Sequence, residues 1–228
     1  MSALATLLTL AMTAATTEPT YVALGDSTGV GVGARHGGGY PDRLAARSRR
    51  GGRPLRLVNL CVSGATVADL AAGQLEPALA ARPAVFTLGI GINDVMRGTQ
   101  LASFARDYER VAAALAGTGA EVLVVNVPDL ARSPLALDDE ARRALHARVE
   151  GVNACIAETA RRHGFALVDL YGATAPELSR DGELLSEDRF HPSDLGYERW
   201  TDVVAPAFAQ ALSAAEPGGR LPPPRALR

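Results

Sequence analysis

Ser27 is the first residue of this 228-residue chain whose type and surroundings suggest chemistry. It lies in the segment Gly-Asp-Ser-Thr-Gly at residues 25–29, directly after an apolar run at residues 20–24. A serine between a strand and a helix can expose its hydroxyl at the edge of a sheet, and flanking glycines let backbone N–H groups approach a ligand closely. Such a hydroxyl can act as a nucleophile. The plainer alternative is that a serine at this position only caps the next helix.

Three more groups of this kind follow later in the chain. Gly64 stands just before a predicted helix, so its N–H can point into the same cleft, and the amide of Asn93 can donate a hydrogen bond to an oxyanion. Asp188 precedes His191 by three residues, a spacing at which a carboxylate can reach the imidazole and fix its tautomer, and Pro192 stiffens the turn. Each group alone has a plainer interpretation: a loop glycine, an Asn-Asp turn, or polar residues at a helix start.

The elements that must position these residues alternate between apolar strands and helices. Strands are predicted at residues 20–24, 55–60, 84–89, 121–127 and 166–170. Helices are predicted at residues 40–50, 65–81 (with a break near Gly73 and Pro77), 101–116, 138–163 and 193–212, the last with Ser193 as its N-cap. Most of the strands are apolar throughout, which is typical of a parallel sheet covered by helices. We therefore predict a three-layer α/β/α sandwich with a five-stranded, mainly parallel sheet, and the four groups fall at its ligand-binding edge.

Together, the four groups resemble the SGNH hydrolase family, which is also called the GDSL esterases and lipases. Gly25-Asp26-Ser27 matches its first block, Gly64 its second, Gly91-Ile92-Asn93-Asp94 its third and Asp188-Arg189-Phe190-His191 its last. The resemblance spans roughly residues 20–212. One departure is visible, because Thr28 replaces the leucine of the GDSL motif at a position outside the chemistry. The resemblance implies the flavodoxin-like SGNH hydrolase fold, with no metal and no cofactor.

By the same resemblance, Ser27 is the nucleophile, His191 is the general base, and Asp188 orients His191 and stabilises its charge. The oxyanion hole would consist of the backbone N–H groups of Ser27 and Gly64 and the side-chain amide of Asn93. The implied reaction is hydrolysis of a small-molecule carboxylic ester through an acyl-enzyme. The same residues serve lysophospholipases, thioesterases, sugar O-deacetylases and acyltransferases, so these alternatives stay open at this stage.

The short segments at the strand ends leave no obvious lid, so we expect small or medium acyl groups. Candidate pocket residues follow or flank the motifs: Thr28, Arg35, Tyr40, Val95, Met96, Leu130 and Phe190. Asp26 and Asp94 are expected to bind backbone near the site. His36, His146 and His163 are expected to be surface or structural residues.

Three other interpretations are weaker. Residues 25–29 also fit the nucleophile elbow of α/β-hydrolases, but those proteins have several strands before the elbow, and Ser27 follows the first. The glycines at residues 29–34 match a dinucleotide fingerprint, but Asn59-Leu60 stands where a Rossmann fold has an acidic residue. A non-catalytic binding domain would not need every motif residue, and all of them are present.

Composition and charge exclude several further classes. Hydrophobic residues make up 47% and charged residues 21% of the chain, which indicates a globular domain rather than a disordered or polytopic membrane protein. The net charge of −2 offers no positive field that would bind nucleic acid. Two cysteines cannot form a disulfide framework. We expect a monomer without stable membrane insertion.

The two ends of the chain differ from its centre. The apolar stretch at residues 3–15 is too short to span a bilayer, which needs about 20 residues. Residues 1–17 are therefore interpreted as either a signal peptide or an N-terminal helix, and export and a cytoplasmic location stay equally open. Residues 18–214 are the predicted hydrolase domain, and residues 215–228 are predicted to be a mobile tail rich in Pro and Gly. In an exported chain, Cys61 and Cys155 could form a disulfide.

Overall fold

The computed structural model describes residues 18–132, 138–178 and 182–215. Within them, one sheet of five strands forms the centre of the domain: β1 (Thr20–Gly25), β2 (Arg56–Asn59), β3 (Val85–Gly89), β4 (Glu121–Val125) and β5 (Ala166–Val168). These strands pair in parallel in the spatial order β2-β1-β3-β4-β5. All of β3, and all but the first residue of β1 and of β4, are buried, as expected for strands covered on both faces.

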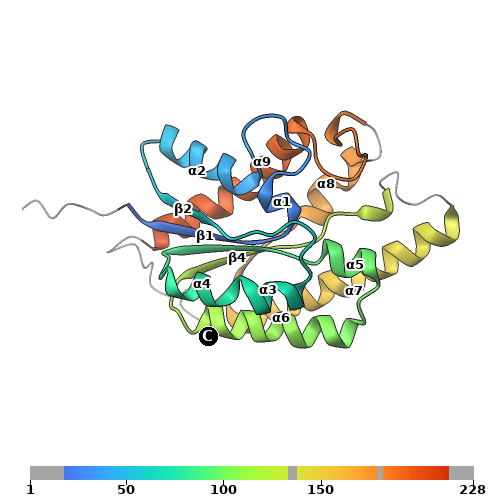
Figure 1. The fold of residues 1–228 in the computed structure, drawn as a ribbon, viewed down its shortest axis with the longest axis horizontal. Coiled ribbons are helices and arrows are strands. Elements are labelled where there is room, and N and C mark those ends of the chain that lie inside the picture. Colours follow the sequence, from blue (N-terminus) through green and yellow to red (C-terminus); the bar gives the residue numbers. More distant parts are fainter. Residues whose placement is uncertain (1–17, 133–137, 179–181, 216–228) are drawn as a thin grey trace, which may run out of the picture.

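Helices cover both faces of the sheet, which gives three layers (Figure 1). One face carries α1 (Ser27–Val30), α2 (Tyr40–Arg50), α8 (Leu170–Leu178) and α9 (Asp194–Ala214). The other carries α3 (Val67–Gly73), α4 (Leu75–Ala80), α5 (Ile92–Arg97), α6 (Leu101–Ala116) and α7 (Asp139–His163). Two short 3₁₀-helices, η1 (Leu130–Arg132) and η2 (Gly182–Leu184), lie in the connections.

The predicted three-layer fold is confirmed, with one refinement: the described strands are all parallel rather than mainly parallel. α2 and α6 occupy the predicted residues 40–50 and 101–116. The helix predicted at residues 65–81 is divided into α3 and α4, with Gln74 between them. β2 and β5 are the edge strands and are partly exposed, so burial on both faces applies only to the inner strands.

The sequence analysis did not predict α1, α5 or α8. α1 has four residues and α5 has six, and helices of this length are too short to show an apolar period. α8 has no pronounced apolar face and contains Gly172 in its first turn. These three helices owe their existence to their surroundings in the fold more than to local propensity.

The strand order creates a crevice between β1 and β3. From β1 the chain runs to β2 on one side, and it then crosses to β3 on the other side. Connections that leave two neighbouring strands in opposite directions open a crevice at their carboxyl ends. Ser27 follows β1 and Asn93 follows β3 by a few residues. The topology therefore brings these two predicted site residues to one place.

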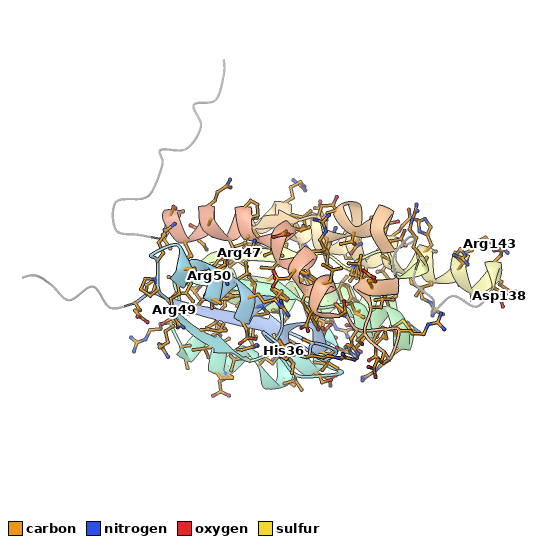
Figure 2. All side chains as sticks on the ribbon, turned by 90° about the horizontal axis from the view of Figure 1, so that it is seen from above. His36, Arg47, Arg49, Arg50, Asp138 and Arg143 are labelled. Carbon is orange, nitrogen blue, oxygen red and sulfur yellow. The ribbon has the colours of Figure 1, made fainter. Side chains whose placement is uncertain are left out.

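The arginine-rich end of α2 lies away from that crevice. Figure 2 shows Arg49 and Arg50 at one end of the molecule and Arg143, near the start of α7, at the other. Basic side chains favour the last turn of a helix because its carbonyl groups carry partial negative charge. Arg47 of the same turn pairs with Asp202 of α9 at 2.8 Å.

In the described part of the chain, none of the helices has the length and apolarity needed to cross a membrane.

Candidate active site

Two hydrogen bonds join the side chains of Ser27, His191 and Asp188, although Ser27 and His191 are 164 residues apart in sequence. Nε2 of His191 lies 3.0 Å from Oγ of Ser27, and Nδ1 of His191 lies 2.6 Å from Oδ2 of Asp188. An ionised carboxylate only accepts hydrogen bonds, so the neutral imidazole carries its proton on Nδ1 and presents a lone pair to the serine hydroxyl. In this order of groups a base can take the proton of a hydroxyl nucleophile.

The loop before α9 explains the spacing between Asp188 and His191. Oδ1 of Asp188 accepts hydrogen bonds from the backbone N–H groups of Phe190 and His191, both at 2.9 Å, and from the Ser186 hydroxyl at 2.8 Å. Arg189 turns the chain with a φ of 58°, so that Oδ2 faces the imidazole. Burial opposes ionisation, but the hydrogen bonds from the imidazole and these donors prevail and hold the pKa of Asp188 well below its usual range.

Asp26 fixes the start of α1 beside Ser27. Its Oδ1 accepts hydrogen bonds from the N–H and the hydroxyl of Thr28, at 3.0 and 2.8 Å, which makes Asp26 the N-cap of α1. Asp26 is 1% exposed, and burial raises its pKa to about 6 in spite of these hydrogen bonds. Thr28, which stands in place of the motif leucine, thus supplies a second hydrogen bond to this carboxyl group that leucine could not.

Two glycines beside Ser27 are required by close approaches of other segments. A Cβ at Gly25 would lie 2.4 Å from the carbonyl oxygen of Gly89 on β3, and a Cβ at Gly29 would lie 2.2 Å from Sγ of Cys61. Side chains at these positions would push the strand or the loop away. The glycines of the first motif are therefore needed for packing around the serine.

Gly64 and Asn93 lie on segments that are bonded to each other. Nδ2 of Asn93, in the first turn of α5, donates a hydrogen bond to the carbonyl of Ala65 at 3.0 Å. Arg97 of the same helix donates a hydrogen bond to the carbonyl of Gly64 at 2.8 Å. The φ of Gly64 is 80°, which glycine adopts without strain. Because a carboxamide has two N–H groups, Asn93 retains a second donor besides the one that Ala65 uses.

Asp94, the next residue of α5, adds a hydrogen bond to the start of α3, close to Gly64 and Ala65. Its Oδ2 accepts a hydrogen bond from the backbone N–H of Val67, at the start of α3, at 3.0 Å. Asp94 is 1% exposed, so this contact lies inside the domain. Asp94 therefore binds backbone near the site, as expected from the sequence.

The glycine-rich loop between α1 and α2 supports His191. A Cβ at Gly33, whose φ is 91°, would lie 2.7 Å from the carbonyl oxygen of Pro192 and 2.9 Å from Cβ of His191. The hydroxyl of Tyr197, on α9, donates a hydrogen bond to the carbonyl of Val32 at 2.8 Å. The glycine-rich loop is therefore packed directly against His191, and the hydrogen bond from Tyr197 holds it to α9.

Arg43 anchors the same glycine-rich loop from α2. Its side chain is 9% exposed and donates hydrogen bonds to the carbonyls of His36 and Gly38, at 2.6 and 3.2 Å. It also pairs with Asp194, at 2.9 Å, and with Glu198, both on α9. A buried guanidinium needs such partners, because an unpaired charge inside a protein is costly.

An apolar pocket opens beside Ser27 and His191. Its walls come from the loops at the carboxyl ends of the strands and from five helical elements, α5, η1, α8, η2 and α9. They include Ile92, Pro128, Leu130, Leu184, Phe190 and Trp200. Thr28 also lines it, so three of the seven predicted pocket residues, Thr28, Leu130 and Phe190, meet there. An apolar wall next to a serine and a histidine suits the hydrocarbon part of a substrate.

The other four predicted pocket residues lie elsewhere. Arg35 is exposed and lines a separate hollow between the glycine-rich loop and the loop of Asp188. Tyr40 is fully buried and its ring stacks on that of Trp200, with centroids 6.0 Å apart. Val95 is buried within α5, and Met96 is exposed on the same helix. These residues flank the motifs in sequence without reaching the pocket in space.

Trp200 and Leu184 are pocket residues that the sequence analysis missed. Leu184 belongs to η2, and Trp200 lies on the buried face of α9. Neither has a local signal that separates it from an ordinary core residue. The one available hint was that Trp200 is the single tryptophan of the chain and follows His191 by nine residues.

The remaining histidines and both cysteines take no part in the hydrogen bonds that join Ser27, His191 and Asp188. His36 is exposed, while Nε2 of His146 and of His163 lies 3.3 and 2.9 Å from a carboxylate oxygen of a glutamate on α7 and on α6, respectively. Cys61 and Cys155 are free and partly buried. Across residues 18–132, 138–178 and 182–215, no group of three or more His, Cys, Asp or Glu side chains is arranged to hold a metal ion.

Residues 23–199 match the model of the GDSL-like lipase/acylhydrolase family. The match covers well over half of the chain, so the chain belongs to this family and is an ester-cleaving hydrolase of the GDSL/SGNH type. The resemblance inferred from the four sequence groups is thereby confirmed.

Solved structures share the fold over most of this chain. TesA is 23% identical with a TM-score of 0.70, and the match covers 84% of this chain and 99% of TesA. LAE5, an alpha/beta hydrolase enzyme from the metagenome of Lake Arreo, Spain, is 27% identical with a TM-score of 0.66, covering 87% of this chain and 97% of LAE5. AlinE4, an SGNH-hydrolase family esterase, is 24% identical with a TM-score of 0.60, covering 86% and 97%. A search of curated proteins finds no match to the chain.

Proposed function

We propose that the chain is a carboxylesterase in which Ser27 is the nucleophile, His191 the general base and Asp188 the residue that orients the base. The observation that carries this proposal is the pair of short contacts on the imidazole, 3.0 Å to Ser27 and 2.6 Å to Asp188. As Oγ of Ser27 attacks the ester carbonyl, His191 accepts its proton, and the carboxylate of Asp188 stabilises the imidazolium that forms.

The rest of the reaction follows from the same groups. The tetrahedral intermediate collapses when its C–O bond breaks, and His191 gives its proton to the departing alcohol. A water molecule then gives a proton to His191 and attacks the acyl carbon. The bond between that carbon and Oγ breaks, His191 returns its proton to Oγ of Ser27, and the acid leaves. In both halves the negative oxygen is stabilised by the N–H groups of Ser27 and Gly64 and by the free N–H of Asn93. The Asn93–Ala65 hydrogen bond supports this assignment because it joins the segments that carry two of the donors.

The proposed substrates are esters of small or medium acyl groups. The pocket beside Ser27 has a cavity volume of about 60 Å³. A water-sized group takes up about 30 Å³ in the liquid, so the enclosed part of the pocket suits a short acyl chain. An acyl group such as butyryl would lie against Leu130, Phe190 and Trp200. A palmitoyl chain would have to leave most of its length in solvent.

The test uses p-nitrophenyl esters from acetate to palmitate with the purified chain and its Ser27→Ala variant. We expect hydrolysis that is fastest for butyrate or hexanoate and is lost in the variant. Ser103→Ala, on α6, is the matched control and should hydrolyse at the unchanged rate. Equal hydrolysis by the parent and Ser27→Ala would refute the role of Ser27. Faster cleavage of the palmitate ester than of the butyrate ester would refute the acyl preference.

A further inference from the structure

Gln74 makes a two-point contact with the last residue of β1. Its Oε1 accepts a hydrogen bond from the N–H of Gly25 at 3.0 Å, and its Nε2 donates one to the carbonyl of Gly25 at 2.8 Å. The side chain comes from the junction of α3 and α4, 49 residues away in sequence. Gln74 is 3% exposed. The carboxamide thus pairs with Gly25 as a neighbouring strand would.

The contact lies just past the last registered pair of β1 with β2. The last registered pair of β1 with β2 is Ala23 with Asn59, while β3 continues alongside as far as Gly25. Beyond Asn59 the departing chain donates to the carbonyls of Ala23 and Gly25, and Gln74 is the partner of the Gly25 N–H. Without Gln74, this buried N–H would lose the hydrogen bond that satisfies it.

Gly25 is two residues before Ser27, and the residue between them is extended, with φ −117° and ψ −152°. A shift of the Gly25 peptide is therefore carried directly to the start of α1. On its other side Gly25 is already packed against the carbonyl of Gly89, with no room for a Cβ. Relaxation after loss of the carboxamide would move the strand end toward the departing side, away from its present position. Reacting groups must be held within a fraction of an ångström for full rate.

We infer that Gln74 is a positioning residue for the nucleophile: its carboxamide holds the end of β1 so that Oγ of Ser27 stays at hydrogen-bond distance from His191. This inference rests on the proposed role of Ser27. Gln74 touches neither the pocket nor the histidine, so its effect falls on the chemical step rather than on substrate binding.

The chain offers a matched control in Asn153 of α7. Its Oδ1 accepts a hydrogen bond from the N–H of Val127 at 2.9 Å, and its Nδ2 donates one to the carbonyl of Val127 at 2.8 Å. The chemistry is the same two-point contact of a carboxamide with one residue after a strand. Val127 follows β4, and the segment after it contributes Pro128 and Leu130 to the pocket wall but no catalytic group of the proposed mechanism, so the control is read in kcat rather than in KM.

The first experiment compares Gln74→Met with Asn153→Leu on p-nitrophenyl butyrate, well below both melting temperatures. Each variant should lower Tm by about 5 °C through loss of its hydrogen bonds. Gln74→Met should lower kcat about 10- to 100-fold with KM within about threefold, and Asn153→Leu should keep kcat within about twofold. If both variants keep kcat, or both lose it equally, Gln74 has only a structural role and the inference is overturned. Hydrolysis that survives Ser27→Ala would instead overturn the proposed function.

A second variant decides the question if Gln74→Met does not fold. In Gln74→Glu a protonated carboxyl group has one donor and one acceptor, so it can restore both contacts with Gly25, whereas the ionised form repels the carbonyl. The ratio of kcat for this variant to that of the parent should therefore rise several-fold as the pH is lowered from 8 to 5.5. A ratio that does not change with pH would overturn the inference.

Discussion

Replacing Asp188 by Asn changes a single atom that matters to the proposed mechanism. The Oδ1 atom of the new side chain can still accept the hydrogen bonds from Ser186, Phe190 and His191, so the loop should keep its shape. In place of Oδ2, 2.6 Å from Nδ1 of His191, an NH₂ group would donate. The imidazole would then have to accept at Nδ1 and carry its proton on Nε2, where it faces Ser27. In that tautomer it cannot act as the base.

The same substitution in serine proteases with this arrangement lowers kcat by about 10⁴-fold, which corresponds to about 5 kcal/mol of activation free energy. The Asp188 side chain is 45% exposed, so solvent can partly relieve the mismatch, and we expect a loss of about 10³- to 10⁴-fold. The assay is kcat on p-nitrophenyl butyrate between pH 6 and 9, with Tm measured alongside. Ser186→Ala is the control, because it removes one hydrogen bond from the same carboxylate without altering the tautomer, and its loss should stay below about tenfold. An Asp188→Asn variant that folds and keeps a tenth or more of the parent kcat would refute the assigned role.

Three further predictions follow from the geometry. Asn93→Ala should keep Tm within a few degrees but lower kcat by about 100-fold on p-nitrophenyl butyrate, and near-normal turnover would remove Asn93 from the oxyanion hole. The buried Asp26 has a pKa raised to about 6, so between pH 4 and 6 the folded state keeps a proton on Asp26 that the unfolded chain has lost. The contribution of this carboxyl group to the free energy of unfolding is therefore complete below pH 4 and is lost as the pH rises through 6. Urea unfolding should therefore show Asp26→Asn gaining up to about 3 kcal/mol relative to the parent between pH 4 and 7, and a pH-independent difference would contradict this. Gly33→Ala would place a Cβ 2.9 Å from that of His191 at a positive φ, so we expect lower Tm and at least tenfold lower kcat, whereas unchanged values would show that the loop does not support the histidine.

The long elements were predictable because their signals are local. α6 has an apolar stripe that ends before Gly117 and Gly119, and β3 and β4 are apolar runs between polar or glycine residues. α5 and α1 were missed because four to six residues at the carboxyl end of a strand show no period. Their form depends on contacts such as the Asp26 cap on Thr28 and the bond between Asn93 and Ala65.

The residues of the site were likewise predictable only in part: the candidate catalytic groups were found from the sequence, and most pocket residues were not. Ser27, Gly64, Asn93, Asp188 and His191 were singled out because chemically useful side chains recur at predicted strand ends in one order, and because that order matches a known family. The pocket was predicted less well. Tyr40 follows the glycine-rich loop in sequence but packs in the core, whereas Trp200, two helical turns into α9, lines the pocket. Proximity to a motif along the chain does not determine which way a helix turns its side chains.

By itself, the sequence determined the layers of this protein, the edge of the sheet at which its chemistry is placed, and the residues that can carry it, because apolar periodicity and the spacing of Asp188 and His191 are local properties of the chain. Only the tertiary structure decided that His191 lies 3.0 Å from Ser27 and that Gln74 forms two hydrogen bonds with Gly25. The same holds for Arg43, which connects the glycine-rich loop to α9 through ion pairs. These contacts join residues 49 to 164 positions apart. They depend on how helices pack across a twisted sheet, and no short stretch of sequence contains that information.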